Sequence, residues 1–169
     1  MSVMLYLMRH GIAEEPRHGG ADGERALTAE GIRKTTRVAE ALRTLDVRPD
    51  AILSSPLRRA EETARIAATV LAKNCAIELT PLLAGGTAPE AIAKGLRPSR
   101  RAAHILLVGH MPDLGDLASY LLTGSAHRAP LPFKKAGVAA IEVDGLPPKT
   151  PGLLHWFATP ALLCGAGKK

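Results

Sequence analysis

Three short apolar runs along the chain end abruptly in polar residues. They cover residues 3–8, 51–55 and 104–108, and the first and third are followed by Arg-His and Gly-His pairs. Nearly continuous apolar runs of this length are typical of strands that are buried on both faces of a parallel sheet. We therefore predict three buried strands that deliver polar side chains at their carboxyl ends.

Apolar residues at helical spacing follow the first two of these strands. Thr28 is a suitable N-cap for a helix that must end before Pro49, and Pro56 closes the second strand ahead of another helix. Each buried strand is thus expected to lead into a helix. The expected inward residues are Ile32, Thr35, Ala39, Leu42 and Leu45 in the first helix, and Ala60, Ala64, Ala67 and Leu71 in the second.

The second half of the chain continues this alternation with shorter elements. Residues 77–79 are expected to form a short strand, and Pro89 suits the first turn of a helix. Pro112 and Asp113 open a further helix that Gly124 is expected to end. The inward stripe of this helix is Leu114, Leu117, Ala118 and Leu121.

The remaining segments predict a loop, a hairpin and a tail. Residues 14–24 are polar and rich in glycine, which indicates a loop over the carboxyl end of the first strand. Residues 138–143 and 153–157 flank the turn-rich DGLPPKTPG and predict a hairpin with a long loop. Residues 161–169 are expected to be a loose tail, so that the domain spans residues 1–160.

The repeated strand–loop–helix order predicts an α/β fold. With 169 residues and 46% hydrophobic content, the chain is expected to form one domain with a proper core. Aromatic residues make up only 3%, which suits helices stacked on a sheet better than an aromatic-rich sandwich. We predict a single-domain, three-layer arrangement in which helices cover both faces of a mainly parallel sheet.

The charge of the chain is compatible with an anionic ligand. The formal net charge is +6, but no stacking aromatic residues accompany the arginines, which argues against a nucleic-acid partner. The apolar start is too short for a signal peptide, and no run reaches the length needed to span a bilayer. We therefore expect a soluble cytoplasmic protein with no membrane partner. Cys75 and Cys164 lie far apart outside any Cys/His cluster, so neither a disulfide nor a metal site is expected.

Polar side chains gather at three junctions between a strand and the next helix. These are Arg9-His10-Gly11, the SPLRR segment at residues 55–59, and Gly109-His110. Because such junctions converge on one edge of a parallel sheet, two imidazoles and at least two guanidiniums are expected in one pocket. Gly11 would let the backbone approach a ligand. This set of groups suits a phosphate.

Four segments of the chain, in this order, resemble the histidine phosphatase superfamily, which shares its fold with the cofactor-dependent phosphoglycerate mutases. They are LYLMRHGIAEE, RALTAEG, LSSPLRRAEETA and LLVGHMPDLGDLASYL, and together they cover nearly the whole chain. Within this superfamily the sequence is most similar to the SixA-type phosphohistidine phosphatases. The resemblance implies a phosphoglycerate mutase-like fold and a phosphatase that needs no cofactor or metal.

The resemblance also implies roles for individual residues. His10 corresponds to the nucleophile and Arg9 to the guanidinium beside it. Arg59 is the arginine fourth after the serine in the family pattern, and His110 corresponds to the second catalytic histidine. Arg25 corresponds to a residue at the mouth of the pocket that binds substrate.

Elementary chemistry agrees with these roles. A neutral imidazole with a pKa near ~6.5 is a competent nucleophile at pH 7, and neighbouring cations should lower the pKa of His10. A backbone carbonyl that accepts from its other nitrogen would fix the tautomer. Arg9 and Arg59 present forked donors to the oxygens of the transferred phosphoryl group, which lysine could not do. His110, if protonated when substrate is bound, would add a charged donor.

Other polar residues near these segments have structural explanations. Arg58 is expected to be solvated, and Ser54 and Ser55 are expected only to terminate a strand, because neither lies in a GxSxG elbow. For Arg25, an ion pair with Asp22 or Glu24 is nearly as good an explanation as contact with a ligand.

The stretch that supplies a general acid in larger relatives is Pro81-Leu82-Leu83 here, which lacks a carboxyl group. A leaving imidazole needs less protonation than an alkoxide, so we expect phosphohistidine on a protein, such as a histidine-containing phosphotransfer domain, to be the substrate. Two alternatives remain. One is a phosphatase or mutase for a small metabolite, in which Glu14, Asp113 or another acid donates the proton; the other is a non-catalytic module that recognises phosphorylated partners.

Overall fold

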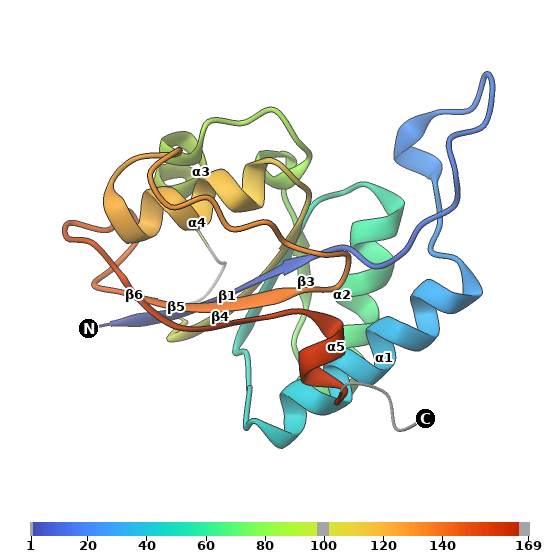
Figure 1. Cartoon of the computed structure of the whole chain (residues 1–169), viewed down its shortest axis with the longest axis horizontal. Coiled ribbons are helices and arrows are strands. Elements are labelled where there is room, and N and C mark those ends of the chain that lie inside the picture. Colours follow the sequence, from blue (N-terminus) through green and yellow to red (C-terminus); the bar gives the residue numbers. More distant parts are fainter. Residues whose placement is uncertain (1, 98–101, 166–169) are drawn as a thin grey trace.

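The computed structural model describes residues 2–97 and 102–165. In this part of the chain one six-stranded sheet runs through the molecule in the order β3-β2-β4-β1-β5-β6 (Figure 1). The first four strands in this order are parallel, and β5 and β6 form an antiparallel hairpin at one edge. The strands are β1 (Val3–Arg9), β2 (Ala51–Ser54), β3 (Ile77–Leu79), β4 (His104–Gly109), β5 (Val138–Val143) and β6 (Leu153–Ala158).

Helices cover both faces of this sheet (Figure 1). On one face lie α1 (Ala29–Thr44), α2 (Arg58–Leu71) and the short α5 (Pro160–Leu163), and on the other lie α3 (Pro89–Gly95) and α4 (Asp113–Thr123). Two short 3-10 helices, η1 (Asp22–Glu24) and η2 (Pro81–Leu83), lie in connections. The predicted α/β class with a mainly parallel, helix-covered sheet is confirmed. None of the helices in the described residues has the length and apolar character to cross a membrane.

The core is divided into two layers by the alternation of side chains along the strands. In β1, Leu5 and Leu7 belong to the cluster under α3 and α4, whereas Tyr6 and Met8 belong to the cluster under α1 and α2. Both faces of the central strands are buried, which explains why these strands read as continuous apolar runs rather than as alternating ones.

The first helix begins as expected but buries a different face. Thr28 Oγ1 accepts a hydrogen bond of 3.0 Å from Gly31 N, as an N-cap does. Ile32 and Leu45, expected to face inward, are 48% and 56% exposed, so that part of the prediction is wrong. A side chain at Gly31 would collide with the Ile12 carbonyl, and this close approach sets the buried face. That face consists of Gly31, Thr35, Val38, Ala39 and Leu42.

The segment after Pro160 is more ordered than the sequence indicated. A loose tail was expected at residues 161–169, but its first residues belong to α5. Thr159 Oγ1 accepts a hydrogen bond of 3.3 Å from Leu162 N at the start of this helix. Leu163 and Cys164 are half-buried and pack against the core on the α1 side. Residues 166–169 lie outside the described residues.

Candidate active site

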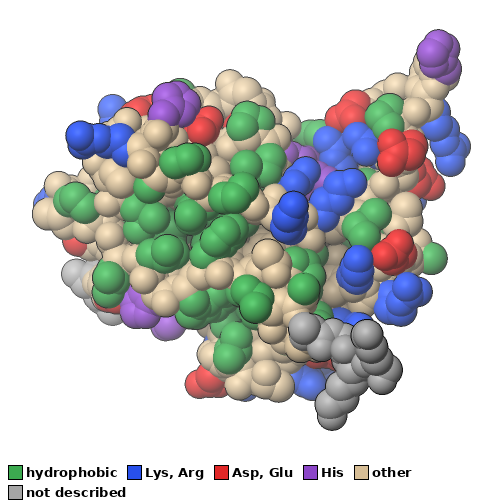
Figure 2. All heavy atoms as spheres, in the orientation of Figure 1, with side chains coloured by type: hydrophobic (Ala, Val, Ile, Leu, Met, Phe, Trp, Pro, Cys, Tyr) green, Lys and Arg blue, Asp and Glu red, His purple; other side chains and the backbone are tan. Residues whose placement is uncertain are grey.

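The two histidines lie side by side because β1 and β4 are neighbours in the sheet. Arg9 is paired with Gly109 in the parallel register, and His10 N donates a hydrogen bond of 3.1 Å to the Gly109 carbonyl. The rings of His10 and His110 therefore lie 5.1 Å apart between centroids, and each residue is only 7% exposed. Figure 2 shows histidine atoms between Lys and Arg side chains on this face.

His10 is held as a neutral imidazole with a defined tautomer. Its Nδ1 lies 2.7 Å from the Gly11 carbonyl, and because a carbonyl only accepts, the proton is on Nδ1. The lone pair is then on Nε2. Burial lowers the pKa of His10 to about 3, helped by the charges of His110, Arg59 and Arg9 and opposed by the Gly11 hydrogen bond. The cations lower the pKa of His10 as expected, but burial lowers it more.

Gly11 supports His10 through a hydrogen bond and close packing, and the expected approach of a ligand to its backbone stays a prediction. Its N–H already donates to Thr63 Oγ1 at 3.0 Å, and Thr63 Oγ1 in turn donates to the Arg59 carbonyl at 2.7 Å. A side chain at Gly11 would collide with Thr35 Oγ1. Close packing against α1 therefore requires glycine here, and its N–H is not free for a ligand. This hydrogen-bond chain ties the turn after His10 to the start of α2.

Asp22 bridges two of the predicted arginines. Arg59, buried at the start of α2, donates from Nη1 to the Asp22 carbonyl at 2.8 Å and from Nη2 to Oδ2 at 2.9 Å. Arg25 donates from Nη1 to Oδ1 at 2.9 Å and from Nε to the Glu14 carbonyl at 2.6 Å. Hydrogen bonds from Arg25 and then Arg59 lower the pKa of Asp22. The ion pair of Arg25 with Asp22 is therefore present, and contact of Arg25 with a ligand stays a prediction.

Arg58 and Arg59 point to different surroundings, although they are adjacent in sequence. Arg58 is exposed and pairs with Glu62 at 2.8 Å along α2, as expected of a solvated neighbour. The other oxygen of Glu62 accepts from Leu27 N at 2.7 Å, which holds the loop end against this helix. Only Arg59 turns toward the histidines, and its charge lowers the pKa of both.

His110 has a partner that sequence reasoning missed. Its Nε2 is hydrogen-bonded to Ser55 Oγ at 2.8 Å, and the same oxygen accepts a hydrogen bond from Leu57 N at 3.2 Å. Ser55 thus does more than terminate β2. The signal that identifies it is its place at the carboxyl end of β2, next to β4 in the sheet.

His110 is also held neutral in the free protein at pH 7. Burial lowers its pKa to about 4, with a further contribution from Arg59, while Asp113 and Asp22 act in the opposite direction. Protonation of His110 when substrate is bound therefore needs the negative charge of that substrate.

Arg9 completes the group of four. It is half-buried, and its Nη1 donates to the Phe133 carbonyl at 2.8 Å. Burial lowers the pKa of Arg9, and the positive charge of Arg9 contributes to the lowered pKa of both histidines. Two guanidiniums and two buried imidazoles therefore share one electrostatic environment, where they could bind a tetrahedral anion beside a nucleophilic nitrogen. Among residues 2–97 and 102–165, no group of three or more His, Cys, Asp or Glu is arranged to hold a metal.

The mainly parallel sheet places His10 and His110 together at its carboxyl edge, and comparisons with known proteins identify the class of protein. The sequence model described as "Histidine phosphatase superfamily (branch 1)" matches residues 5–84. A Picosynechococcus protein, SYNPCC7002_A2622, is 38% identical over 145 residues, covering 81% of this chain and 83% of its own length. The chain belongs to the histidine phosphatase superfamily and is a phosphatase.

Named relatives agree with this placement. The phosphohistidine phosphatase SixA of Escherichia coli is 25% identical over 163 residues, which is 95% of this chain and 96% of SixA. A structure of the protein histidine phosphatase SixA complexed with tungstate superposes with a TM-score of 0.79 at 24% identity, covering 95% of this chain and 99% of that one. A phosphoglycerate mutase from Bacillus anthracis superposes with a TM-score of 0.66 at 16% identity, covering 98% and 97%. The phosphoglycerate mutase-like fold is confirmed.

Proposed function

We propose that this phosphatase removes the phosphoryl group from phosphohistidine in a protein partner through a phosphohistidine intermediate on His10. One observation carries the proposal. The buried imidazole of His10 has its proton fixed on Nδ1 by the Gly11 carbonyl, so that Nε2 offers a lone pair within a group of cations. This is what an in-line attack on a phosphoryl group requires.

The reaction has two transfers. In the first, His10 Nε2 forms a bond to phosphorus while the P–N bond of the substrate breaks, and the released imidazole takes a proton from water. In the second, water attacks the phosphorus on His10, its proton is lost to solvent, and inorganic phosphate leaves. Arg9 and Arg59 would neutralise the charge on the three equatorial oxygens in both transfers.

Two buried polar atoms at the site support a bound anion. Arg9 Nε and His110 Nδ1 are buried without a hydrogen-bond partner among the described residues. Such atoms are costly unless something else satisfies them, and a phosphate group supplies both acceptor oxygens and negative charge.

The acids around the site favour a leaving group that needs little protonation. Asp22, bound by Arg25 and Arg59, has a lowered pKa and is therefore ionised at neutral pH. Asp113 is buried and its Oδ2 accepts from Thr87 N at 3.1 Å. Leu82 stands at the middle of the Pro81-Leu82-Leu83 stretch, where larger relatives place an acid. A phosphoester would release an alkoxide with no evident donor, whereas imidazole is a better leaving group. The name of SixA, a phosphohistidine phosphatase, is in keeping with this choice.

The test compares two substrates with the same protein. We expect efficient hydrolysis of a phosphohistidine peptide or of a phosphorylated histidine-containing phosphotransfer domain, and weak hydrolysis of sugar phosphates. A protein that hydrolyses a sugar phosphate efficiently and ignores phosphohistidine is instead the metabolite phosphatase. A protein that binds phosphorylated partners without turnover is a recognition module. The variant His10→Ala serves as the inactive control for both substrates.

A further inference from the structure

A second hollow lies beside the nucleophile, on the side of Arg9 that faces α1 and α5. It has a volume of about 660 Å³ and is open to solvent. Five of its lining side chains are basic and none is acidic. We call it the basic groove, and its charged residues are Arg9, Lys34, Arg37, Lys134 and Lys135.

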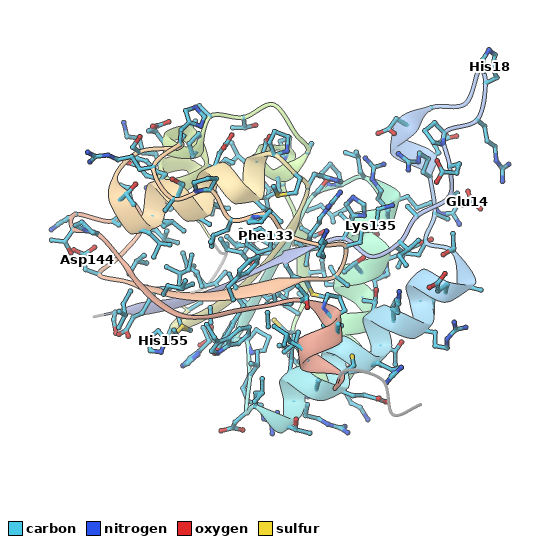
Figure 3. All side chains as sticks on the ribbon, viewed as in Figure 1. Glu14, His18, Phe133, Lys135, Asp144 and His155 are labelled. Carbon is cyan, nitrogen blue, oxygen red and sulfur yellow. The ribbon has the colours of Figure 1, made fainter. Side chains whose placement is uncertain are left out.

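The lysines of the basic groove are held at the catalytic strand by backbone hydrogen bonds. Ala136 N donates to the carbonyls of Arg9 and His10, each at 3.1 Å. Arg9 N donates to the Gly137 carbonyl at 3.1 Å, and the turn itself is closed by a bond of 2.7 Å from Gly137 N to the Lys134 carbonyl. Figure 3 shows Lys135 on this segment, near the carboxyl end of β1. The segment that carries Lys134 and Lys135 thus has a defined position relative to the nucleophile.

Most of this charge is not neutralised within the protein. Among the described residues, no acidic side chain forms an ion pair with Arg37, Lys134 or Lys135, and only Lys34 is paired, at 3.2 Å with Glu30 along α1. Figure 2 shows Lys and Arg side chains gathered on this face. The larger hollow of about 750 Å³ under the loop at residues 14–26 contrasts with it, because five acidic and three basic side chains line that one. Of these two hollows, the basic groove is the one whose lining favours negative charge.

The floor of the basic groove is apolar and lacks aromatic rings. Ile12, Pro160, Ala161 and Cys164 contribute to it, and no Phe, Tyr or Trp does. Nucleobases bind most often by stacking on aromatic side chains, which this groove does not provide. An acidic polypeptide fits better, because its aliphatic atoms can cover the floor while its carboxylates meet the basic rim.

We propose that the basic groove is the docking surface for an acidic segment that flanks the phosphohistidine of the protein substrate. The inference rests on the proposed function. Arg9 connects the two sites, since it lines the groove and its charge acts on both histidines. A substrate whose phosphoryl group reaches His10 would lay its neighbouring residues over Lys134 and Lys135.

The experiment measures kcat/KM on matched substrates over a series of salt concentrations. Each of two peptides contains one phosphohistidine and one leucine. The residues that flank them are glutamate in the first peptide and glutamine in the second. N-phosphoimidazole is the small substrate. The variant Arg37→Glu with Lys134→Glu is compared with Lys73→Glu with Lys94→Glu. All four side chains are exposed, the charge change is equal, and Lys73 and Lys94 lie outside the groove.

We expect the groove variant to lose about tenfold or more of kcat/KM for the glutamate peptide at low salt, mainly through KM. Its activity toward the glutamine peptide and N-phosphoimidazole should stay at the wild-type level, as should that of the control variant toward all three. Docking is contradicted if wild-type protein hydrolyses both peptides and the groove variant either keeps its activity or loses it equally on every substrate. The proposed function stands in that case. If wild-type protein hydrolyses no phosphohistidine substrate, both proposals fail.

Discussion

Asp22 holds both terminal nitrogens of Arg59, one through its carbonyl at 2.8 Å and one through its carboxylate at 2.9 Å. The guanidinium that we expect to bind phosphate is therefore engaged by the loop that projects beside α2 (Figure 1). The Asp22 side chain is 60% exposed, so it can move away at little cost in burial. In the free protein the carboxylate of Asp22 thus occupies a donor of Arg59 that we expect a phosphate oxygen to use when substrate binds.

Removing the negative charge of Asp22 should strengthen the binding of inorganic phosphate. We expect Asp22→Asn to bind phosphate about threefold more tightly, because the exposed Asp22 carboxylate keeps its ion pair with the buried Arg59 near the ~0.2–1 kcal/mol of surface pairs. Titration calorimetry measures the change. Glu24→Gln on the same 3-10 helix is the control and should leave the affinity unchanged. Weaker binding by Asp22→Asn would mean that Asp22 positions Arg59 for the ligand rather than competing with it.

Neighbouring arginines at the start of α2 offer a matched pair of variants. Arg59→Lys should lower kcat by about 100-fold, because lysine cannot supply two parallel donors to the phosphoryl oxygens. Arg58→Lys should stay within about twofold of wild type, since Arg58 is exposed and its ion pair is with Glu62. Steady-state kinetics on a phosphohistidine peptide distinguishes the two. Equal losses in both variants would contradict the assignment of Arg59.

Ser55 should act as a positioning residue for His110. Ser55→Ala removes the hydrogen bond to His110 Nε2, and a bond of this kind is worth about 0.5–1.5 kcal/mol. We expect kcat to fall by up to about tenfold with little change in KM. Ser54→Ala is the control, because Ser54 is equally buried but its hydroxyl donates to the Ser55 carbonyl rather than to a histidine. A change in KM with kcat unaffected would point to a role in binding instead.

The two buried histidines should make the protein less stable in acid. Their pKa values are lowered from 6.5 to about 3 and about 4, so between pH 6.5 and 4 the unfolded chain binds protons that the folded chain does not. Stability is then fully present above pH 6.5 and is lost as the pH falls toward the folded values.

Urea unfolding at pH 7 and pH 5 measures this dependence. For His110→Gln, the difference in unfolding free energy between the two pH values should be smaller than in wild type by about 2 kcal/mol. His18→Gln, at the exposed tip of the projecting loop, should keep the wild-type difference (Figure 3). An unchanged difference in His110→Gln would contradict the lowered pKa.

The sequence predicted the order and type of the elements well, because burial on both faces leaves a continuous apolar signal in β1, β2 and β4. End signals were equally informative: Thr28 caps α1, and Gly124 ends α4 with a left-handed φ of 74°. The buried face of α1 was predicted incorrectly at two positions. A close backbone approach between Gly31 and Ile12 determines that face, and spacing along one helix does not reveal contacts with a distant segment.

For the site, the convergence of His10 and His110 was predictable from the parallel order of strands. Asp22 was expected beside Arg25 but not beside Arg59, and Ser55 was not expected beside His110, because these two contacts join residues that are far apart in the sequence. The sequence predicted that a backbone carbonyl would fix the tautomer of His10 but not which one. That the carbonyl belongs to Gly11 depends on the local turn geometry. The roles of these residues remain predictions.

Trapping phosphate on His10 tests the central claim most directly. The reaction with a phosphohistidine substrate is quenched rapidly, and the protein is digested and examined for a phosphoryl group that is labile in acid and stable in base. We predict that wild-type protein carries it on His10, and that His10→Ala shows neither the label nor turnover. Turnover by His10→Ala, or a label on another residue, would contradict the account.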